Sequence, residues 1–391
     1  MIKYHKFDRM KIAKDEEDFI MQKISLKNVQ DGMIVARNIY DSEGQKLLSV
    51  GTILNSQYIR RLLQLSIPAI YVKFNDDDDD IDCPDDIISE ETRVSAIKNL
   101  STAFRKCQAT SNVDMPLFEA TTKNLVDALL SNRSNVIQMN DIRCYDDYTF
   151  AHSVNVSILS AMLAMFRDYT PKRLHEVTLG ALLHDIGKIK IPKPILNKIG
   201  SLTAEEFAIV RKHSEDGFNI LRKCRDMSIV PMHVAFQHHE KYDGTGYPRG
   251  LKGAEIHEYA RIVAIADVYD ALTADRPYRI ACLPYEAYRI MIQYANKQFD
   301  NELLETFFSY IAVFPVGCTV QLNTGEYGIV TDVEQNYTFT PKIKLLTTAD
   351  NKLCQGNIIL DLKKEKSYVS RSLRETELLE LHQQIKSGLL K

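Results

Sequence analysis

The sequence has 391 residues, of which 45% are hydrophobic and 26% are charged, and its formal net charge is −3. This length exceeds one ordinary hydrophobic core, so two or three domains are expected, and the balance of residue types is that of a soluble globular protein. The small net charge provides no overall basic field, which argues against charge-driven binding to duplex nucleic acid.

The sequence contains no obvious segment for secretion or for crossing a membrane. Its longest nearly apolar run, residues 156–166, is shorter than the ~20 residues that a helix needs to span a bilayer. The first residues lack the apolar core of a signal peptide. The seven cysteines include no C-x-x-C pair, which argues against a zinc knuckle or a disulfide framework. We therefore expect a cytoplasmic protein.

Residues 1–74 are predicted to form a small α+β unit with a regulatory role, whose signal the sequence does not identify. Residues 33–40 alternate in the manner of a strand, 41–44 read as a turn, and 46–54 continue as a second strand. Asn55 stands at the N-cap position before an amphipathic run, and residues 67–72 fit a closing strand.

Residues 75–88 are predicted to be a flexible linker. Five consecutive aspartates occupy positions 76–80, and a proline follows at position 84. Mutual repulsion and low hydrophobicity keep such a segment solvated.

Residues 89–311 show the periodicity of helices. Apolar side chains recur at the spacing i, i+3, i+4 and i+7 at Leu179, Leu182, Leu183 and Ile186. A similar spacing follows His152. Both patterns place one helix face against a core, so we expect an all-helical domain.

The pattern changes after residue 311. Residues 312–368 contain short strand-like runs, two of them around an Asn-Thr-Gly turn at 323–325, and residues 369–391 resemble a terminal amphipathic helix. The expected fold is therefore multidomain and mainly α. A central helical bundle is flanked by an N-terminal α+β unit and a small C-terminal β domain.

Seven residues inside the helical region are candidate metal ligands. Successive groups of them are separated by 25 to 32 residues, the length of a helix with its connections: His152, His184, Asp185, His213, His238, His239 and Asp267. Donors from successive helices can converge in a bundle core, where metal sites are commonly built. Several of them sit in apolar stretches, and burying so many ionisable groups without a metal would be costly.

The types of these residues indicate the metal. Five imidazoles and two carboxylates without a thiolate suit iron, manganese or zinc. Seven donors are too many for one tetrahedral ion, and Asp185 is the natural bridge between two. Two ions about 3.5–4 Å apart can activate water and stabilise a phosphoryl transition state.

Further residues suit a phosphate-containing substrate. On a helix, Lys188 would lie on the same face as His184 and Asp185. Arg276 and Arg279 have guanidinium groups that match phosphate geometry. Each of these three could equally be a surface charge. Tyr247, in a tight loop with two glycines and a proline, either stacks on a base or fills the core.

Three motifs closely resemble the HD-GYP subgroup of the HD hydrolase superfamily, over about residues 148–279. They are HDIGKIKIPKPILNKIGSLTAEE, HHEKYDGTGYPRGLKGAEI and ARIVAIADVYDALTADRPYR. The resemblance implies hydrolysis of the bacterial second messenger cyclic di-GMP to linear pGpG, and in some members to GMP, at a centre of two or three metal ions.

The resemblance also implies roles for individual residues. One ion would be held by His152, His184, Asp185 and Asp267, and the second by Asp185, His213, His238 and His239. Lys188, Arg276 and Arg279 would contact the substrate phosphates. The loop with Gly246, Tyr247 and Pro248 is linked in some relatives to diguanylate cyclase partners. Trinuclear members carry Glu where this chain has Tyr148, which favours two ions and leaves complete hydrolysis to GMP open.

The expected mechanism is in-line attack by metal-activated water, with Asp185 as bridging ligand and Lys188 orienting the scissile phosphate. Two alternatives stay open. The module could be a catalytically weak sensor or docking scaffold, or it could cleave another cyclic dinucleotide such as cyclic GMP-AMP. A homodimer is also left open by the sequence.

Overall fold

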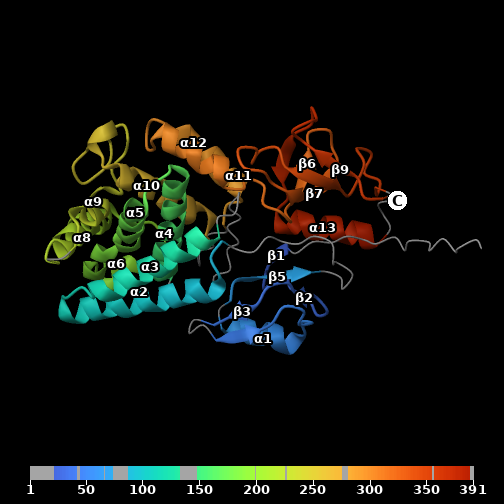
Figure 1. The fold of residues 1–391 in the computed structure, drawn as a ribbon. Helices are drawn as coiled ribbons and strands as arrows, with labels where there is room; N and C mark the ends of the chain where they lie inside the picture. The colour runs from blue at the N-terminus through green and yellow to red at the C-terminus, as the bar shows by residue number, and fades with distance from the viewer. Residues whose placement is uncertain are drawn as a thin grey trace, which may run out of the picture.

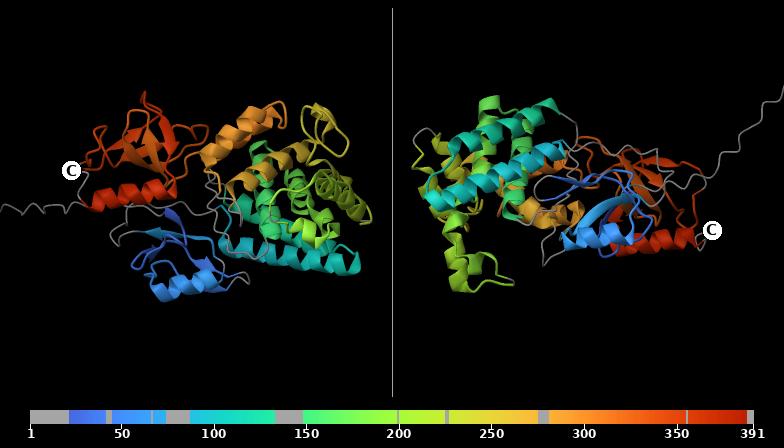
Figure 2. Two further views of the ribbon diagram at one scale, coloured as in Figure 1. Left: turned by 180° about the vertical axis from the view of Figure 1, so that it is seen from behind. Right: turned by 90° about the horizontal axis from the view of Figure 1, so that it is seen from below.

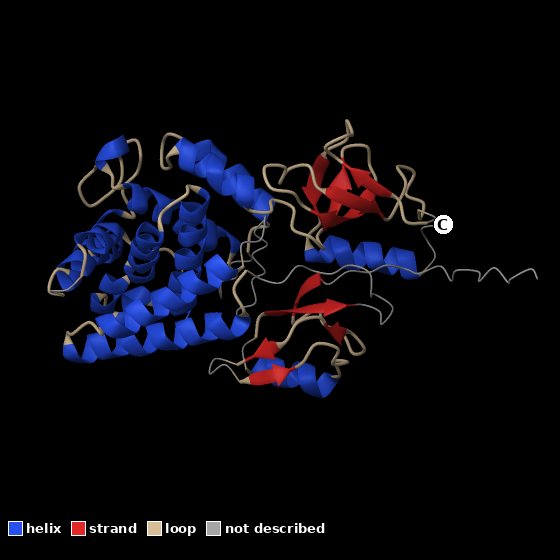
Figure 3. Ribbon diagram, viewed as in Figure 1, coloured by secondary structure: helices blue, strands red, loops and turns tan. Residues whose placement is uncertain are grey.

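The computed structural model describes residues 22–41, 45–65, 67–73, 87–132, 148–198, 200–224, 227–274, 281–354 and 356–387. Its elements form a small N-terminal unit, a helical domain and a C-terminal β domain (Figure 1). Among the described residues, strands are confined to the first and last of these groups (Figure 3). The expected mainly helical class, with a small unit before the bundle and another after it in the chain, is confirmed.

The N-terminal unit is built from short antiparallel strands and one helix: β1 (Gln22–Ser25), β2 (Ile34–Val35), β3 (Ile39–Tyr40), β4 (Lys46–Leu48), α1 (Ser56–Gln64) and β5 (Ala69–Lys73). Strands β1, β5 and β2 form one sheet in that order, and β3 pairs with β4. An aliphatic core that includes Ile24, Val35 and Leu62 lies between the sheet and α1.

The N-cap prediction for α1 is confirmed, because the Asn55 side chain accepts hydrogen bonds from the backbone N–H groups of Gln57 and Tyr58, both at 2.9 Å. The two predicted long strands are wrong in length. Residues 33–40 divide into β2 and β3, and residues 46–54 are a strand only over β4. Gly51 has a φ of 82°, a left-handed conformation that interrupts an extended strand.

The helical domain contains α2 (Glu90–Thr110), α3 (Met115–Ser131), α4 (Tyr148–Phe166), α5 (Pro171–Leu183), η1 (Ile186–Lys190), α6 (Lys193–Leu196), α7 (Ala204–Arg211), α8 (His213–Leu221), α9 (Ile229–Gln237), η2 (Gly253–Glu255), α10 (Glu258–Thr273), α11 (Pro284–Met291), η3 (Ile292–Tyr294) and α12 (Asn301–Tyr310). Helix α4 lies at its centre, packed against α5 and α10. The core side chains of these helices form one continuous cluster.

Helix α4 is the one described helix that is long and apolar enough to cross a membrane, over Thr149–Phe166 with a mean hydropathy of 1.4. However, 83% of this window is buried inside the protein. Its apolar character is accounted for by its central position in the bundle.

The predicted linker at 75–88 lies outside the described residues, except for Ile87 and Ile88. Both are buried in the core of the helical domain. These two residues are therefore not part of a solvated linker, because their apolar side chains pack with α2 and its neighbours.

The C-terminal domain is a five-stranded antiparallel sheet followed by a helix: β6 (Thr319–Leu322), β7 (Tyr327–Asp332), β8 (Lys342–Leu345), β9 (Ile359–Asp361), β10 (Val369–Ser372) and α13 (Glu375–Lys386). The strand order is β10-β6-β7-β8-β9. The predicted terminal helix over 369–391 is wrong at its start, because residues 369–372 pair with β6 as an edge strand. The helix begins at Glu375.

Helix α13 lies between the C-terminal sheet and the N-terminal unit (Figures 1 and 2). Glu375 accepts a hydrogen bond from the backbone N–H of Ser25 at 2.9 Å. At the same end, Arg374 donates to Glu286 on α11 at 2.6 Å. The first turn of α13 thus joins the N-terminal unit to the helical domain.

A close backbone contact sets the position of η1 on α8. A Cβ atom on Gly187 would lie 1.9 Å from the carbonyl oxygen of His213 and 2.6 Å from the backbone nitrogen of Gly217. No side chain fits there. Glycine at position 187 therefore allows the segment after α5 to reach α8.

We expect Gly187→Ala to lower the free energy of unfolding by about 1–3 kcal/mol, because the added methyl group forces η1 away from α8. Urea denaturation followed by circular dichroism measures this change. The matched control is Gly217→Ala on the facing helix, where the nearest atom to a Cβ is at 3.4 Å. It should retain or increase the stability. Equal stability of the two variants would contradict the packing argument.

Candidate metal centre

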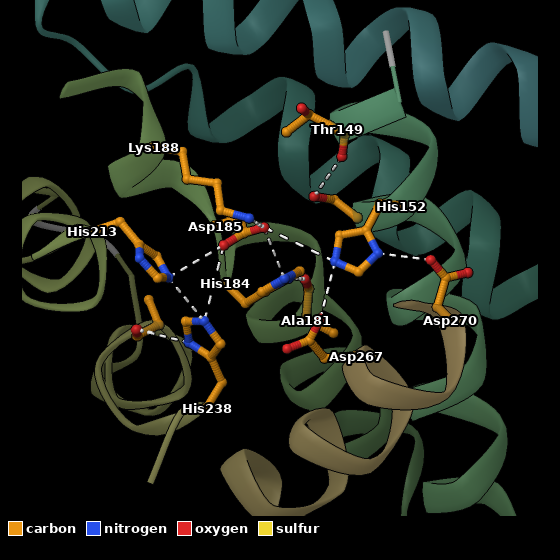
Figure 4. A network of polar contacts seen from close by, with 12 residues as sticks. Thr149, His152, Ala181, His184, Asp185, Lys188, His213, His238, Asp267 and Asp270 are labelled. Atoms are coloured by element: carbon orange, nitrogen blue, oxygen red, sulfur yellow. Dashed lines mark hydrogen bonds and ion pairs between the residues drawn. The ribbon is translucent and has the colours of Figure 1, made fainter. Parts of the chain in front are cut away.

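The carboxylate of Asp185 lies at the centre of a cluster of imidazoles (Figure 4). Its Oδ1 is 3.4 Å from Nε2 of His213 and 3.9 Å from Nε2 of His238. Its Oδ2 is 3.3 Å from Nε2 of His184 and 4.0 Å from Nε2 of His152. Each oxygen of one carboxylate therefore faces a different pair of histidines.

The seven candidate ligands form two adjoining groups. The ligand atoms of His152, His184 and Asp185 lie within 4.8 Å of one another, and so do those of His213, His238 and His239. The seventh, Asp267, lies beside the first group, with its Oδ1 3.1 Å from Nε2 of His152. The structure thus brings together all seven residues that the sequence singled out.

Helix ends supply most of these side chains. His184 is the C-cap of α5 and Asp185 precedes η1, whereas His213 begins α8 and His238 is the C-cap of α9. By contrast, His152 and Asp267 project from the interiors of α4 and α10. The change from α5 to the 3-10 turn η1 directs consecutive side chains into one site.

Backbone carbonyls orient three of the imidazoles. The Nδ1 atoms of His184, His213 and His238 are 2.6, 2.6 and 3.0 Å from the carbonyl oxygens of Ala181, Val210 and Ala235, respectively. A carbonyl only accepts hydrogen bonds, so Nδ1 carries the proton in each ring. The lone pair of Nε2 then faces the cluster, which is the arrangement of a metal-binding histidine.

Two features of the cluster fit a cation. The Nε2 atoms of His213 and His238 are 3.2 Å apart, and both are acceptors when Nδ1 is protonated. Moreover, Nε2 of His184 is buried without a hydrogen-bond partner. Buried acceptors that face each other or have no donor are unfavourable. Divalent transition-metal ions would satisfy these nitrogens, and the donor set of imidazoles and carboxylates suits them.

The protonation states also suit metal ligands. Burial lowers the pKa of His213, lowers that of His238 well below its usual range, and lowers that of His239 to about 3. These imidazoles are therefore neutral at pH 7. Burial alone would raise the pKa of Asp185, but Lys188 and His184 outweigh it and hold this pKa well below its usual range. Asp185 is therefore an anionic donor beside these three neutral imidazoles.

His152 has a different environment because a second carboxylate lies behind it. Its Nδ1 is 2.7 Å from Oδ2 of Asp270, which is buried. Burial lowers the pKa of His152, but the hydrogen bonds to Asp267 and Asp270 outweigh burial and raise it to about 9. Asp270 was not predicted from the sequence. The available signal was its position three residues after Asp267, on the same helix face.

The other predicted contacts have different outcomes. Lys188 forms an ion pair with Oδ2 of Asp185. It thus lies on the face of the cluster that the sequence predicted. Arg276, Arg279 and the side chain of Tyr148 lie outside the described residues.

Tyr247 stacks on the ring of His239, with ring centroids 4.8 Å apart and an interplanar angle of 29°. The loop that carries it is tightly packed, since a Cβ on Gly246 would lie 2.2 Å from the backbone nitrogen of Lys241. The buried carboxylate of Glu240 also accepts hydrogen bonds from two backbone N–H groups of the loop, at 2.8 and 3.0 Å. Tyr247 therefore covers a candidate metal ligand.

Comparison with known proteins agrees with this geometry. Residues 124–303 match the HD domain family, and residues 319–381 match the KOW domain associated with HD domain. The first match contains all seven clustered residues. The second covers the strands β6 to β10 and the first part of α13.

Three curated relatives illustrate the similarity. A cyclic di-GMP phosphodiesterase of Pseudomonas aeruginosa is 37% identical over 247 residues, which are 62% of this chain and 59% of the relative. One of Thermotoga maritima is 40% identical over 163 residues, 41% of this chain and 44% of the relative. The 3'3'-cGAMP-specific phosphodiesterase 1 of Vibrio cholerae is 39% identical over 156 residues, 40% of this chain and 36% of the relative.

The chain thus spans roughly half the length of these relatives, between 36% and 59%. The segment that matches the HD domain family, residues 124–303, includes the helices that carry the His/Asp cluster. Motifs, helical architecture and family match agree that this segment is similar to HD-domain proteins.

Proposed function

We propose that the chain is a metal-dependent phosphodiesterase that hydrolyses cyclic di-GMP to pGpG in the cytoplasm. The observation that carries this proposal is the buried carboxylate of Asp185, which directs one oxygen toward each of two groups of imidazoles. The names of the relatives support a cyclic dinucleotide as substrate. Binding of a diguanylate cyclase through the Tyr247 loop and formation of a homodimer stay predictions.

We assign the metal ligands according to the two groups. One ion would be held by His152, His184, Asp185 and Asp267, and the other by Asp185, His213, His238 and His239. Two divalent ions of iron or manganese, or of zinc, suit this donor set. When bound, they supply an activated water and neutralise charge that develops on the phosphoryl group.

Lys188 is assigned to the substrate. An ammonium group has no lone pair, so it cannot be a metal ligand while protonated. Its Nζ contacts Asp185, and its side chain is 26% exposed, so it faces both the cluster and the solvent. A phosphate oxygen placed beside the centre would receive a charge-assisted hydrogen bond from it.

Asp270 is assigned a positioning role. Its carboxylate accepts a hydrogen bond from Nδ1–H of His152, and Nε2 of the same ring is directed at the cluster. Carboxylates in this position fix the orientation of a metal-binding imidazole and increase its basicity.

The main test of the proposed function compares Asp185, assigned to the metal ions, with Lys188, assigned to the substrate. Asp185→Ala should lose metal and hydrolysis together, because both groups lose their shared anionic ligand. Lys188→Ala should retain metal but lose about 30- to 1000-fold in turnover, equivalent to ~2–4 kcal/mol of transition-state stabilisation. Elemental analysis after anaerobic purification and chromatography of cyclic di-GMP reactions measure both properties.

The matched control is Lys190→Ala, on the same turn. Lys190 is exposed and pairs with Asp216 at 2.8 Å, away from the cluster. It should have the metal content and turnover of the unmodified protein. Normal turnover by Lys188→Ala would refute the role of Lys188, and both metals in an active Asp185→Ala would refute the bridge. If the protein hydrolyses cyclic GMP-AMP but not cyclic di-GMP, the substrate is cyclic GMP-AMP.

We expect about two metal ions per chain, because the seven donors form two groups and Tyr148 is not a carboxylate ligand. Elemental analysis of anaerobically purified protein gives the number directly. A reproducible value near three, or an active protein with almost none, would contradict the assignment.

Asp270→Asn should weaken metal binding about 10- to 100-fold. The amide oxygen can still accept a hydrogen bond from Nδ1–H of His152, but it carries no negative charge to increase the basicity of the ring. Competition with a chromophoric chelator measures this affinity independently of hydrolysis. Asp216→Asn, which removes a partly buried carboxylate that pairs with the exposed Lys190, is the control. An unchanged affinity in Asp270→Asn would show that Asp270 only fills space beside His152.

A further inference from the structure

Helix α7 brings an arginine next to the metal centre. It projects from the bundle together with α6 (Figure 2), and neither helix has a buried residue. Its last residue, Arg211, precedes His213 by two positions. The guanidinium carbon of Arg211 lies 4.5 Å from the centroid of the Tyr247 ring.

A chain of ring contacts connects this arginine to the candidate ligands. Tyr247 stacks on His239 at 4.8 Å, and His239 lies 4.9 Å from His213 by ring centroids. One aromatic ring therefore separates the guanidinium of Arg211 from a candidate metal ligand. Phe207, one helical turn before Arg211, directs its ring at the edge of Tyr247 with centroids 6.5 Å apart.

The guanidinium of Arg211 is held by stacking on Tyr247, and its N–H groups remain available as hydrogen-bond donors. Arg211 is exposed, and no carboxylate among the described residues pairs with it. A guanidinium that stacks on an aromatic face keeps its N–H groups at the edge of the stack, where they can form the paired hydrogen bonds that suit a phosphate.

We propose that Arg211 binds the phosphate of the cyclic dinucleotide that is not being cleaved. This inference rests on the proposed function and deepens it. A cyclic dinucleotide has two phosphates, and only one can occupy the metal centre beside Lys188. The second phosphate needs a cation to one side of the ions, and Arg211 provides one there. Because Tyr247 already restrains the side chain, little conformational entropy is lost on binding.

The test is the affinity for intact cyclic di-GMP in a Lys188→Ala background, which slows turnover during the measurement. Adding Arg211→Gln should raise the calorimetric Kd by about 10- to 100-fold, the loss expected for a charge-assisted contact. Arg211→Lys keeps the charge but not the paired donors. Its Kd should lie between that of the Lys188→Ala background and that of Arg211→Gln. The matched control is Arg222→Gln, an exposed arginine at the end of α8.

A second substrate distinguishes phosphate binding by Arg211 from support of the Tyr247 loop. Bis(4-nitrophenyl) phosphate is a phosphodiester with a single phosphate. In otherwise unmodified protein, Arg211→Gln should lower kcat/KM for cyclic di-GMP at least tenfold more than kcat/KM for this compound. Equal losses with both substrates would overturn the proposal and make Arg211 a support for Tyr247. Metal content, measured in parallel, shows whether the centre is intact.

The two proposals fail in different ways. If the unmodified protein binds cyclic di-GMP without cleaving it, the proposed function is wrong, and the Kd comparison still tests Arg211. If Arg211→Gln binds as tightly as Arg222→Gln while the unmodified protein is active, only the inference about Arg211 is wrong. Failure of the unmodified, metal-loaded protein to bind any cyclic dinucleotide would overturn both.

Discussion

The arrangement of the helical domain depends on the buried charge of Asp185. Its side chain is 2% exposed, and an ionised carboxylate at that depth is costly unless other groups compensate it. Lys188 and the surrounding imidazoles do so in the protein alone, and cations would do so more completely. The close packing of η1 on α8 at Gly187 keeps this carboxylate within reach of His213. The ion pair with Lys188 and the backbone contact at Gly187 thereby hold Asp185 between α5 and α8.

The metal ligands were predictable because they combine two signals, a chemical type and a spacing. His184 and Asp185 lie at the end of an apolar helix, where burial of a polar side chain is unfavourable unless another group binds it. Asp270 was not predicted, because a lone aspartate on an amphipathic helix is ordinarily a surface residue. Its role became visible only when α4 placed His152 opposite it. Similarly, Arg211 belongs to an exposed helix, and only its stacking on Tyr247 distinguishes it from other surface arginines.

The limits of the domains were harder to predict than their classes. Periodicity indicates a helix or a strand but not its partner, so the pairing of residues 369–372 with β6 could not be seen in a tail that otherwise looks helical. In the same way, Ile87 and Ile88 follow an acidic run and were assigned to it. Their burial depends on packing with distant helices. These differences arise where tertiary contacts decide the local structure.

The contact between Ser25 and Glu375 joins residues that are 350 positions apart in the chain. During synthesis the N-terminal unit leaves the ribosome first, whereas its partner in α13 emerges only after the helical and β domains. This edge of the unit therefore remains uncovered until α13 has left the ribosome. Pairing over such a separation closes late in folding, because the loop entropy must be lost before the contact forms. A mutation in α13 would then affect the maturation of a unit that lies about 300 residues earlier in the chain.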